Sequence, residues 1–433
     1  MFIKKSFLDI SVIFLTAIVY LSFISGFYLD ENSAGAGGYN GDFAINWNNL
    51  KIFLNNDFFT SINLTDGSDS ENHYRSSRSP LVYILHSAFN PFIETEIEYR
   101  RSVFLISLLG PLLFYFCLNF KFEKENKIIL FFISSLILLS PYYRTSSYWA
   151  LDENYGYLSL FLSFIFFNLF LKEEKQIKKY SYLFFLTLFS ACCIYFDQKL
   201  LFVPLIFYLR IIFSKQEPVI KFLITFFYMI FSIPFLYLIY LWENIITDSV
   251  EYRGVGEGIY FQNIGYVVSM IAFYFLPFLF IKEKNIFQQI RNFLESKVNF
   301  YLVTAFILYI IYLIFFFDIS TQLVLGKGII HKLSLLLFDH NYYQLIFTYF
   351  AFFVSWIIIL VFLNNKISDI LILIYFGLIS LISLMFLQEY LDPLILILIF
   401  LFFKTKLVLN YKMVLILFVY FSIFLFSSIK FYL

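Results

Sequence analysis

Acidic and basic side chains in this sequence gather in short polar breaks between long apolar runs, and these breaks hold the residues that could do chemistry. The first break reads Tyr28-Leu-Asp30-Glu31-Asn32, and a run rich in glycine separates it from Asp42. Neighbouring carboxylates at a membrane boundary can deprotonate a hydroxyl group or hold a divalent cation. Glycine lets the backbone fold closely around a ligand, which favours a site over the alternative, a solvated loop start.

The second break contains Arg144 and, further along, three consecutive polar residues, Asp152, Glu153 and Asn154. An apolar run follows these three directly, and the positive end of a helix dipole stabilises acids there, so capping explains part of their presence. Arg144 lies among aromatic residues and has no such explanation. Its guanidinium can extend to lipid headgroups or bind a phosphate group through two hydrogen bonds.

Two further breaks carry charges, at Asp197-Gln-Lys199 and at Gln388-Glu389-Tyr390-Leu-Asp392-Pro393. Asp197 and Lys199 either neutralise each other in a tight turn, or Lys199 offers its cation to a phosphate group. The later break is either a second acidic site or an ordinary turn in which Pro393 opens the next helix. The four histidines have no spacing that indicates a helix-borne zinc site.

Composition indicates what kind of protein positions these residues. Of 433 residues, 61% are hydrophobic and 14% charged, against roughly 45–50% and 25% in an average soluble protein, which excludes a soluble domain. The formal net charge of +1 leaves no basic field for nucleic acid. The three cysteines lie in apolar runs, where a thiol acts as a small hydrophobic group and builds no disulfide framework.

Apolar runs that could cross a bilayer repeat along the whole chain. They lie near 10–28, 101–119, 127–141, 153–171, 181–196, 200–214, 222–242, 263–281, 300–317, 345–363, 367–387, 391–403 and 412–430. A crossing needs about 20 residues, so the shortest runs are half-helices or extend into their flanks. We predict an all-α polytopic membrane protein with about 11–13 transmembrane helices. It forms a single integral membrane domain over 1–433, with the helix bundle at 101–281 and 300–430.

The charges divide unequally between the two sides of that bundle. With the N-terminus placed in the cytoplasm, roughly two thirds of the 31 Lys and Arg residues fall on the cytoplasmic side, as the positive-inside rule requires. Most acids fall on the other side, many of them in a long external loop over 29–100. Two amphipathic segments of that loop, Ile45–Leu54 and Leu81–Phe89, are expected to lie in the membrane interface.

These features together resemble the GT-C superfamily of integral-membrane glycosyltransferases. Tyr28-Leu-Asp30-Glu31 matches the position of the family's loop-one acid, and Ser79-Pro80-Leu81-Val82-Tyr83 is similar to the segment that opens its second interfacial helix. The stretch 144–154 resembles the polar run before the fourth span of bacterial members. Residues 388–393 are similar to a Glu-x-Arg-Tyr-x-x-x-Pro pattern but lack its arginine, which leaves Arg144, Lys199 or Arg253 to contact the donor phosphate.

The resemblance implies transfer of a sugar from a polyprenyl-(di)phosphate carrier to a glycan or lipid acceptor, in the synthesis of envelope polysaccharide such as O-antigen or capsule. The site then faces the periplasm, and the protein lies in a bacterial inner membrane. The expected catalytic residues are Asp30, Glu31 and Asp42, and Asp30 and Glu31 are the ligands if Mg²⁺ or Mn²⁺ takes part. The expected substrate-binding residues are Arg78, His86, Arg144, Asp152, Glu153, Asn154, Asp197, Lys199, Arg253, Glu389 and Tyr390.

Two alternatives stay open at this point. A repeat-unit polymerase or ligase also joins lipid-linked sugars outside the membrane and is equally rich in aromatic residues. A flippase or other transporter of lipid-linked oligosaccharide is of a different class. Transporters usually carry ionisable residues or broken helices near the bilayer midplane, whereas the charges here lie at the ends of the apolar runs.

Overall fold

The computed structural model describes residues 2–34, 41–66, 74–76, 78–244, 258–281, 286–316, 327–363, 367–382, 384 and 386–432. Within these ranges the regular structure is helical and contains no strand. The chain divides into two compact units. Unit 1 comprises residues 1–252 with 421–433, and unit 2 comprises residues 253–420.

Nine helices in the described part of the chain are long and apolar enough to cross a membrane, and ten if one bent pair counts as a span. This confirms the prediction of an all-α polytopic membrane protein. The number of such helices is below the expected 11–13 because several apolar runs form short helices. The run near 391–403, for example, yields α19 (Leu394–Leu401) of only 8 residues, far below the roughly 20 that a crossing needs.

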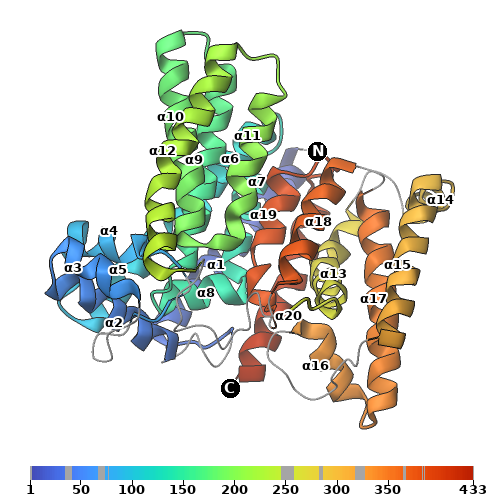
Figure 1. Ribbon diagram of the computed structural model, residues 1–433. Helices are drawn as coiled ribbons and strands as arrows, with labels where there is room; N and C mark the ends of the chain where they lie inside the picture. Colours follow the sequence, from blue (N-terminus) through green and yellow to red (C-terminus); the bar gives the residue numbers. More distant parts are fainter. Residues whose placement is uncertain are drawn as a thin grey trace. The chain divides into compact units, whose positions relative to one another are not determined.

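Unit 1 contains the N-terminal helices. They are α1 (Phe2–Tyr28), α2 (Asp42–Asn55), α3 (Phe58–Asn63), α4 (Leu81–Phe89), α5 (Glu96–Ser107), α6 (Leu109–Lys121), α7 (Lys127–Ser135), α8 (Pro141–Tyr148), α9 (Glu153–Lys172), α10 (Gln176–Phe196), α11 (Phe202–Ile212) and α12 (Pro218–Trp242). In Figure 1, α2 to α5 gather at one end of a bundle that includes α9, α10 and α12. The two amphipathic segments of the sequence form α2 and α4.

Side chains at the helix starts explain where several of these elements begin. Asp57 accepts from the backbone of Phe59 and Thr60 at the start of α3, and Thr95 forms a capping box with Glu98 at the start of α5. Such caps satisfy the amide groups that a first helical turn leaves without partners. The loop after α1 is therefore organised by local hydrogen bonds as well as by packing.

A sharp bend in unit 1 determines where its polar residues lie. Residues 127–139 and α8 meet at an angle of 70°, at a point where Ser140 accepts from the backbone N–H of Tyr143 and Pro141 occupies the first helical position. The bend carries α8 and the following segment into the unit's interior, where every residue from 141 to 154 is buried. A run that is largely polar is thus enclosed by helices.

Unit 2 is built around α13 (Gln262–Phe275), most of which is buried. The other helices are α14 (Ile286–Leu294), α15 (Lys297–Phe316), α16 (Gly328–Leu337), α17 (Asn341–Leu363), α18 (Ile367–Ser380), α19 and the part of α20 (Tyr411–Tyr432) that ends at Tyr420. Aromatic pairs hold the unit together. The rings of Phe275 and Phe362 lie 4.5 Å apart, and those of Phe306 and Trp356 stack at 5.0 Å.

Candidate functional site

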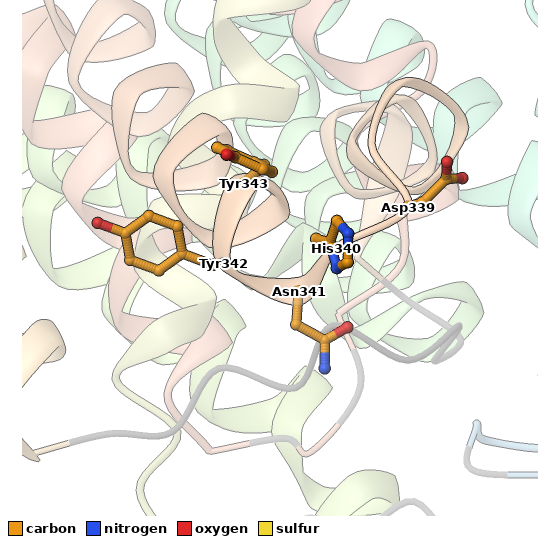
Figure 2. Close-up of a pocket in the computed structure, with 5 residues that line it drawn as sticks. All are labelled: Asp339, His340, Asn341, Tyr342 and Tyr343. Atoms are coloured by element: carbon orange, nitrogen blue, oxygen red, sulfur yellow. The ribbon is translucent and has the colours of Figure 1, made fainter.

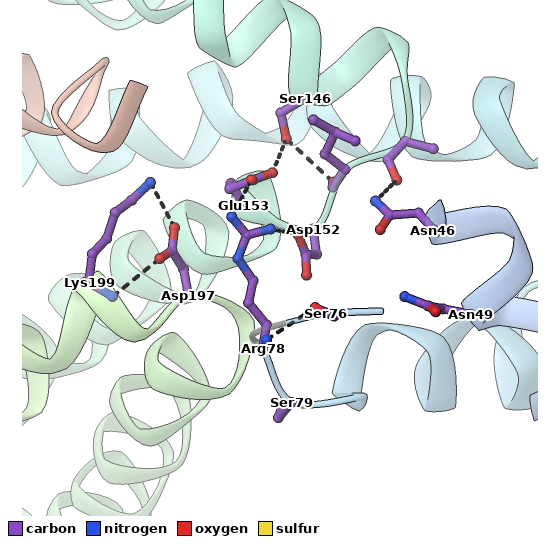
Figure 3. Close-up of polar contacts among 12 residues, drawn as sticks. Asn46, Asn49, Ser76, Arg78, Ser79, Ser146, Asp152, Glu153, Asp197 and Lys199 are labelled. Carbon is purple, nitrogen blue, oxygen red and sulfur yellow. Dashed lines mark hydrogen bonds and ion pairs between the residues drawn. The ribbon is translucent and has the colours of Figure 1, made fainter. Parts of the chain in front are cut away.

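A buried group of charged side chains lies in unit 1 where α9 begins (Figure 3). The guanidinium of Arg78 bridges the carboxylates of Asp152 and Glu153 through its two terminal nitrogen atoms. Both acidic side chains are 3% exposed, and that of Arg78 is 20% exposed. Glu153 also accepts from the hydroxyl groups of Tyr142 and, at 3.1 Å, Ser146. The sequence placed the two acids together but gave no sign that Arg78 joins them.

Hydrogen bonds before and after Arg78 hold the short segment that carries it. The Tyr74 hydroxyl donates to the carbonyl oxygen of Arg78 at 2.9 Å, and Ser79 donates to the carbonyl oxygen of Tyr195 on α10 at 2.7 Å. Asn49 on α2 accepts from the backbone N–H of Arg75 at 3.1 Å. The helices α2 and α10 thereby fix the segment that delivers the guanidinium to the acids.

Burial changes the acid–base behaviour of this group. It raises the pKa of Asp152 to about 7, although the positive charge of Arg78 acts in the opposite direction. Burial also disfavours the charge of Arg78, but the carboxylates of Asp152 and Glu153 outweigh this and hold the pKa of the guanidinium well above its usual value. Near neutral pH, Arg78 is therefore charged, while Asp152 can both hold and release a proton.

Lys199 and Asp197 lie beside these acids (Figure 3). The Lys199 ammonium is 2.8 Å from Asp197 Oδ2, and the two side chains are 9% and 7% exposed. The pair is the arrangement expected if the two residues neutralise each other in a turn. The same ammonium lies 5.4 Å from the ring centroid of Tyr142, which donates to Glu153. Lys199 therefore adds positive charge on the Glu153 side of the group.

The loop-one acids make separate ion pairs. Asp30 contacts Arg100 at 2.7 Å, and its carboxylate is 61% exposed. The guanidinium of Arg100 also lies 4.0 Å from the ring centroid of Trp149, a stacking contact that favours arginine. Asp30 is thus the more accessible acid of the first break, with one cation already beside it.

Glu31 pairs with Arg144 at 2.8 Å, in surroundings that are much more buried. Arg144 is 1% exposed and donates further to the carbonyl oxygen of Leu138 and the hydroxyl of Ser22. A guanidinium so enclosed does not extend to lipid headgroups. The other carboxylate oxygen of Glu31 and the side-chain oxygen of Asn32 are buried and have no hydrogen-bond partner within the described residues, so both can accept from a ligand.

Three other predicted residues of unit 1 have different surroundings. His86 Nε2 lies 2.6 Å from the Tyr155 hydroxyl, and burial lowers the pKa of the ring to about 4, so it is a neutral interior residue at physiological pH. Asn154 donates to Ser147 at 2.8 Å and supports α8. Asp42 is the first residue of α2 and is partly exposed.

Three predicted residues do not belong to unit 1. Glu389 and Tyr390 lie in a short 3₁₀ helix of unit 2, where the Tyr390 ring contacts Phe386 at 5.3 Å. Arg253 lies outside the described residues. The structure thus brings Arg78, Asp152, Glu153, Asp197 and Lys199 together, and it joins Asp30, Glu31 and Arg144 to the same buried segment.

Participation of Mg²⁺ or Mn²⁺ stays a prediction. Mg²⁺ and Mn²⁺ take several oxygen ligands, but no group of three His, Cys, Asp or Glu side chains with metal-binding geometry occurs in the ranges that the structure describes. Each of Asp30, Glu31, Asp152 and Glu153 already contacts an arginine.

A surface recess in unit 2 is a weaker candidate. It is lined by the five consecutive residues Asp339 to Tyr343 at the start of α17 (Figure 2), and all five are exposed. In Figure 2 these side chains point in different directions and do not converge on one point. The recess therefore lacks the buried, mutually contacting charges of unit 1.

Comparisons with protein-family models, with curated proteins and with solved structures found no match to this chain. The case for its function therefore rests on the buried charges of unit 1.

Proposed function

We propose that this protein is a membrane glycosyltransferase that moves a sugar from a polyprenyl-(di)phosphate carrier to a hydroxyl group of a glycan or lipid acceptor. The observation that carries the proposal is the contact of Arg78 with Asp152 and Glu153 in a buried site beside Lys199. Sugar transfer from a lipid phosphate needs a base for the acceptor and cations for the departing phosphate, and this group offers both.

Asp152 is the preferred general base of the proposed reaction. A base works best when its pKa lies near the operating pH, and burial raises the pKa of Asp152 to about 7. The carboxylate takes the proton of the acceptor hydroxyl, whose oxygen forms a bond to the anomeric carbon of the sugar. The bond from that carbon to the phosphate oxygen breaks, and its electron pair leaves with the phosphate.

Arg78 and Lys199 are the cations for the departing phosphate. Charges that are already in place where an anion develops often supply the largest part of catalysis, and arginine binds phosphate oxygens through two parallel hydrogen bonds. Because Arg78 contacts both acids in the free protein, an arriving phosphate competes with Asp152 for the guanidinium. Binding of the donor thereby releases the carboxylate to act as the base.

The first-loop acids remain second candidates for the base. Glu31 has one buried carboxylate oxygen without a partner in the described residues, and Asp30 is exposed. The unequal division of charges supports a cytoplasmic N-terminus. We propose that these acids lie on the external face of a bacterial inner membrane and that the protein takes part in envelope polysaccharide synthesis.

Purified protein in proteoliposomes tests the proposal. A panel of radiolabelled sugars linked to polyprenyl phosphate or diphosphate is supplied singly, with lipid-linked glycan from the source membrane as acceptor. We expect Asp152→Asn to slow transfer by about 10²–10⁴-fold, the usual contribution of a general base, and Arg78→Gln to be similarly impaired. Products that lengthen stepwise would indicate the polymerase, and unmodified donor moved across the bilayer would indicate the transporter.

Glu123→Gln is the matched control, because Glu123 also pairs with a cation, Lys172, but on the exposed surface at 59% exposure. It should leave the transfer rate unchanged. Full activity in Asp152→Asn, with loss of activity in Glu31→Gln or Asp30→Asn, would move the base to the first loop. Absence of transfer from every donor by the unaltered protein would contradict the proposed function.

A further inference from the structure

The short helix α14 of unit 2 is amphipathic, and its apolar face is not covered by the rest of the described chain. Phe287 is 79% exposed, Leu294 is 73% exposed and Ile290 is 42% exposed. Positions i, i+3 and i+7 lie on one side of a helix. Three large apolar side chains therefore form one continuous stripe on the outer side of α14.

One polar residue of α14, Gln289, faces the protein. Gln289 is 5% exposed, and its side-chain amide donates to the carbonyl oxygen of Leu279 at 3.0 Å. A helix on a soluble protein would instead bury residues such as Phe287, Ile290 and Leu294. This hydrogen bond of Gln289 orients the helix. The exposure of Phe287 and Leu294 therefore follows from the way α14 packs on unit 2.

The position of α14 relates it to the end of a membrane span. Only Glu295 and Ser296 separate it from α15, one of the helices long enough to cross a bilayer. Figure 1 shows α14 at the end of α15 and α17, where it does not continue the line of either helix. With α15 crossing the bilayer, as its length and composition allow, the apolar stripe would lie at the depth where acyl chains meet headgroups.

The polar flank of the stripe carries exposed cations. Arg291 is 81% exposed and contacts Glu295 at 2.8 Å, and Lys297 at the start of α15 is also exposed. An exposed ion pair of this kind contributes little, so Arg291 can exchange Glu295 for another anion. Cations that flank an apolar helix face fit the phosphate groups of anionic lipids.

We propose that α14 is an interfacial anchor that inserts Phe287, Ile290 and Leu294 into the acyl-chain boundary and holds anionic lipid headgroups with Arg291 and Lys297. A stable protein interface usually buries about 800 Å² on each partner, more than a three-residue stripe on a 9-residue helix can provide. The occupant is therefore the lipid leaflet. This inference does not depend on sugar transfer.

Spin labels on the full chain in nanodiscs test the anchor. The three native cysteines are replaced, and one new cysteine at a time is placed at 287, 290 or 294, or at the polar positions 288, 292 or 295 as matched controls. Collision with dissolved oxygen reports lipid, and collision with a water-soluble nickel chelate reports water. We expect oxygen access at 287, 290 and 294 and nickel access at 288, 292 and 295.

The lipid composition and the cations are varied in a second arm. In nanodiscs with phosphatidylglycerol, the inserted fraction of the label at 287 should exceed that in pure phosphatidylcholine. Arg291→Gln should lower the ratio of inserted to water-exposed label by about fivefold, the change that corresponds to about 1 kcal/mol for one cation at an anionic surface. Nickel access at 287 and 294 would overturn the proposal, as would labels shielded from both reagents, which would indicate a protein partner or a second copy.

Discussion

Arg144 and Glu31 form a buried ion pair between the end of α1 and α8, so removal of one partner leaves an uncompensated charge inside unit 1. Arg144 is 1% exposed, Glu31 is 13% exposed, and their closest atoms lie 2.8 Å apart. Breaking such a pair from one side costs about 3–5 kcal/mol. In a unit of this size, about 1 kcal/mol shifts Tm by about 2–4 °C, so Arg144→Met should lower Tm by roughly 10 °C.

The double variant Arg144→Met/Glu31→Leu separates an ion-pair effect from a packing effect. It removes both charges, and replacement of a whole buried pair by apolar groups is often neutral or stabilising. We expect it to recover most of the loss seen in Arg144→Met. The assay is the Tm of each purified protein in the same detergent, followed by intrinsic fluorescence.

Lys172→Met is the control for this cycle. Lys172 pairs with Glu123 at the surface, where the two side chains are 55% and 59% exposed, and such pairs contribute about 0–1 kcal/mol. Its Tm should change by at most a few degrees. An ion-pair effect is refuted if Arg144→Met is no less stable than Lys172→Met. It is also refuted if the double variant loses as much stability as the single variants Arg144→Met and Glu31→Leu lose together.

Three further results follow from the same unit. A Cβ atom at Gly26 would lie 2.7 Å from a carboxylate oxygen of Glu31, so Gly26→Ala should lower the free energy of unfolding by about 1–3 kcal/mol. Gly377→Ala is the control and should not lower Tm, because nothing lies within 4 Å of the new carbon. The raised pKa of Asp152 adds stability below its ordinary pKa of 3.8 that is lost as pH rises through about 7, so Asp152→Asn should flatten the fall in Tm over that window. The lowered pKa of His86 adds stability above pH 6.5 that is lost as pH falls toward about 4, and His86→Asn should remove this acid-side loss, with an unchanged slope in that range counting against the burial argument.

Long apolar runs allowed most of the helical architecture to be predicted from the sequence. The run near 153–171 is α9, from Glu153 to Lys172, and the run near 222–242 lies within α12. Such runs specify a helix because the bilayer requires every backbone amide to be paired internally. The helices are less regular than predicted where an apolar run meets a proline or a polar residue. At Pro141, for example, the helix axis turns by 70°.

The candidate site was predicted only in part, because its contacts join residues that are far apart in the chain. Asp152 and Glu153 stood out as adjacent acids, and Asp197 with Lys199 as a local pair. Arg78 was among the residues expected to bind substrate, but its contact with these two acids, more than seventy residues along the chain, was not predicted. Arg100, which contacts Asp30, was not predicted at all, because no local pattern marks it. Pairings of this kind are set by tertiary packing.

The pH dependence of sugar transfer tests the central claim most directly, because it reports the protonation state of the base. If Asp152 is that base, its deprotonated form is required, and the rate should rise with pH and level off above about 7. The Asp152→Asn variant should lose this rise together with the activity. A rate that is already constant at about pH 5, as for an ordinary carboxyl group, or a variant that keeps the full rate and profile, would contradict the account.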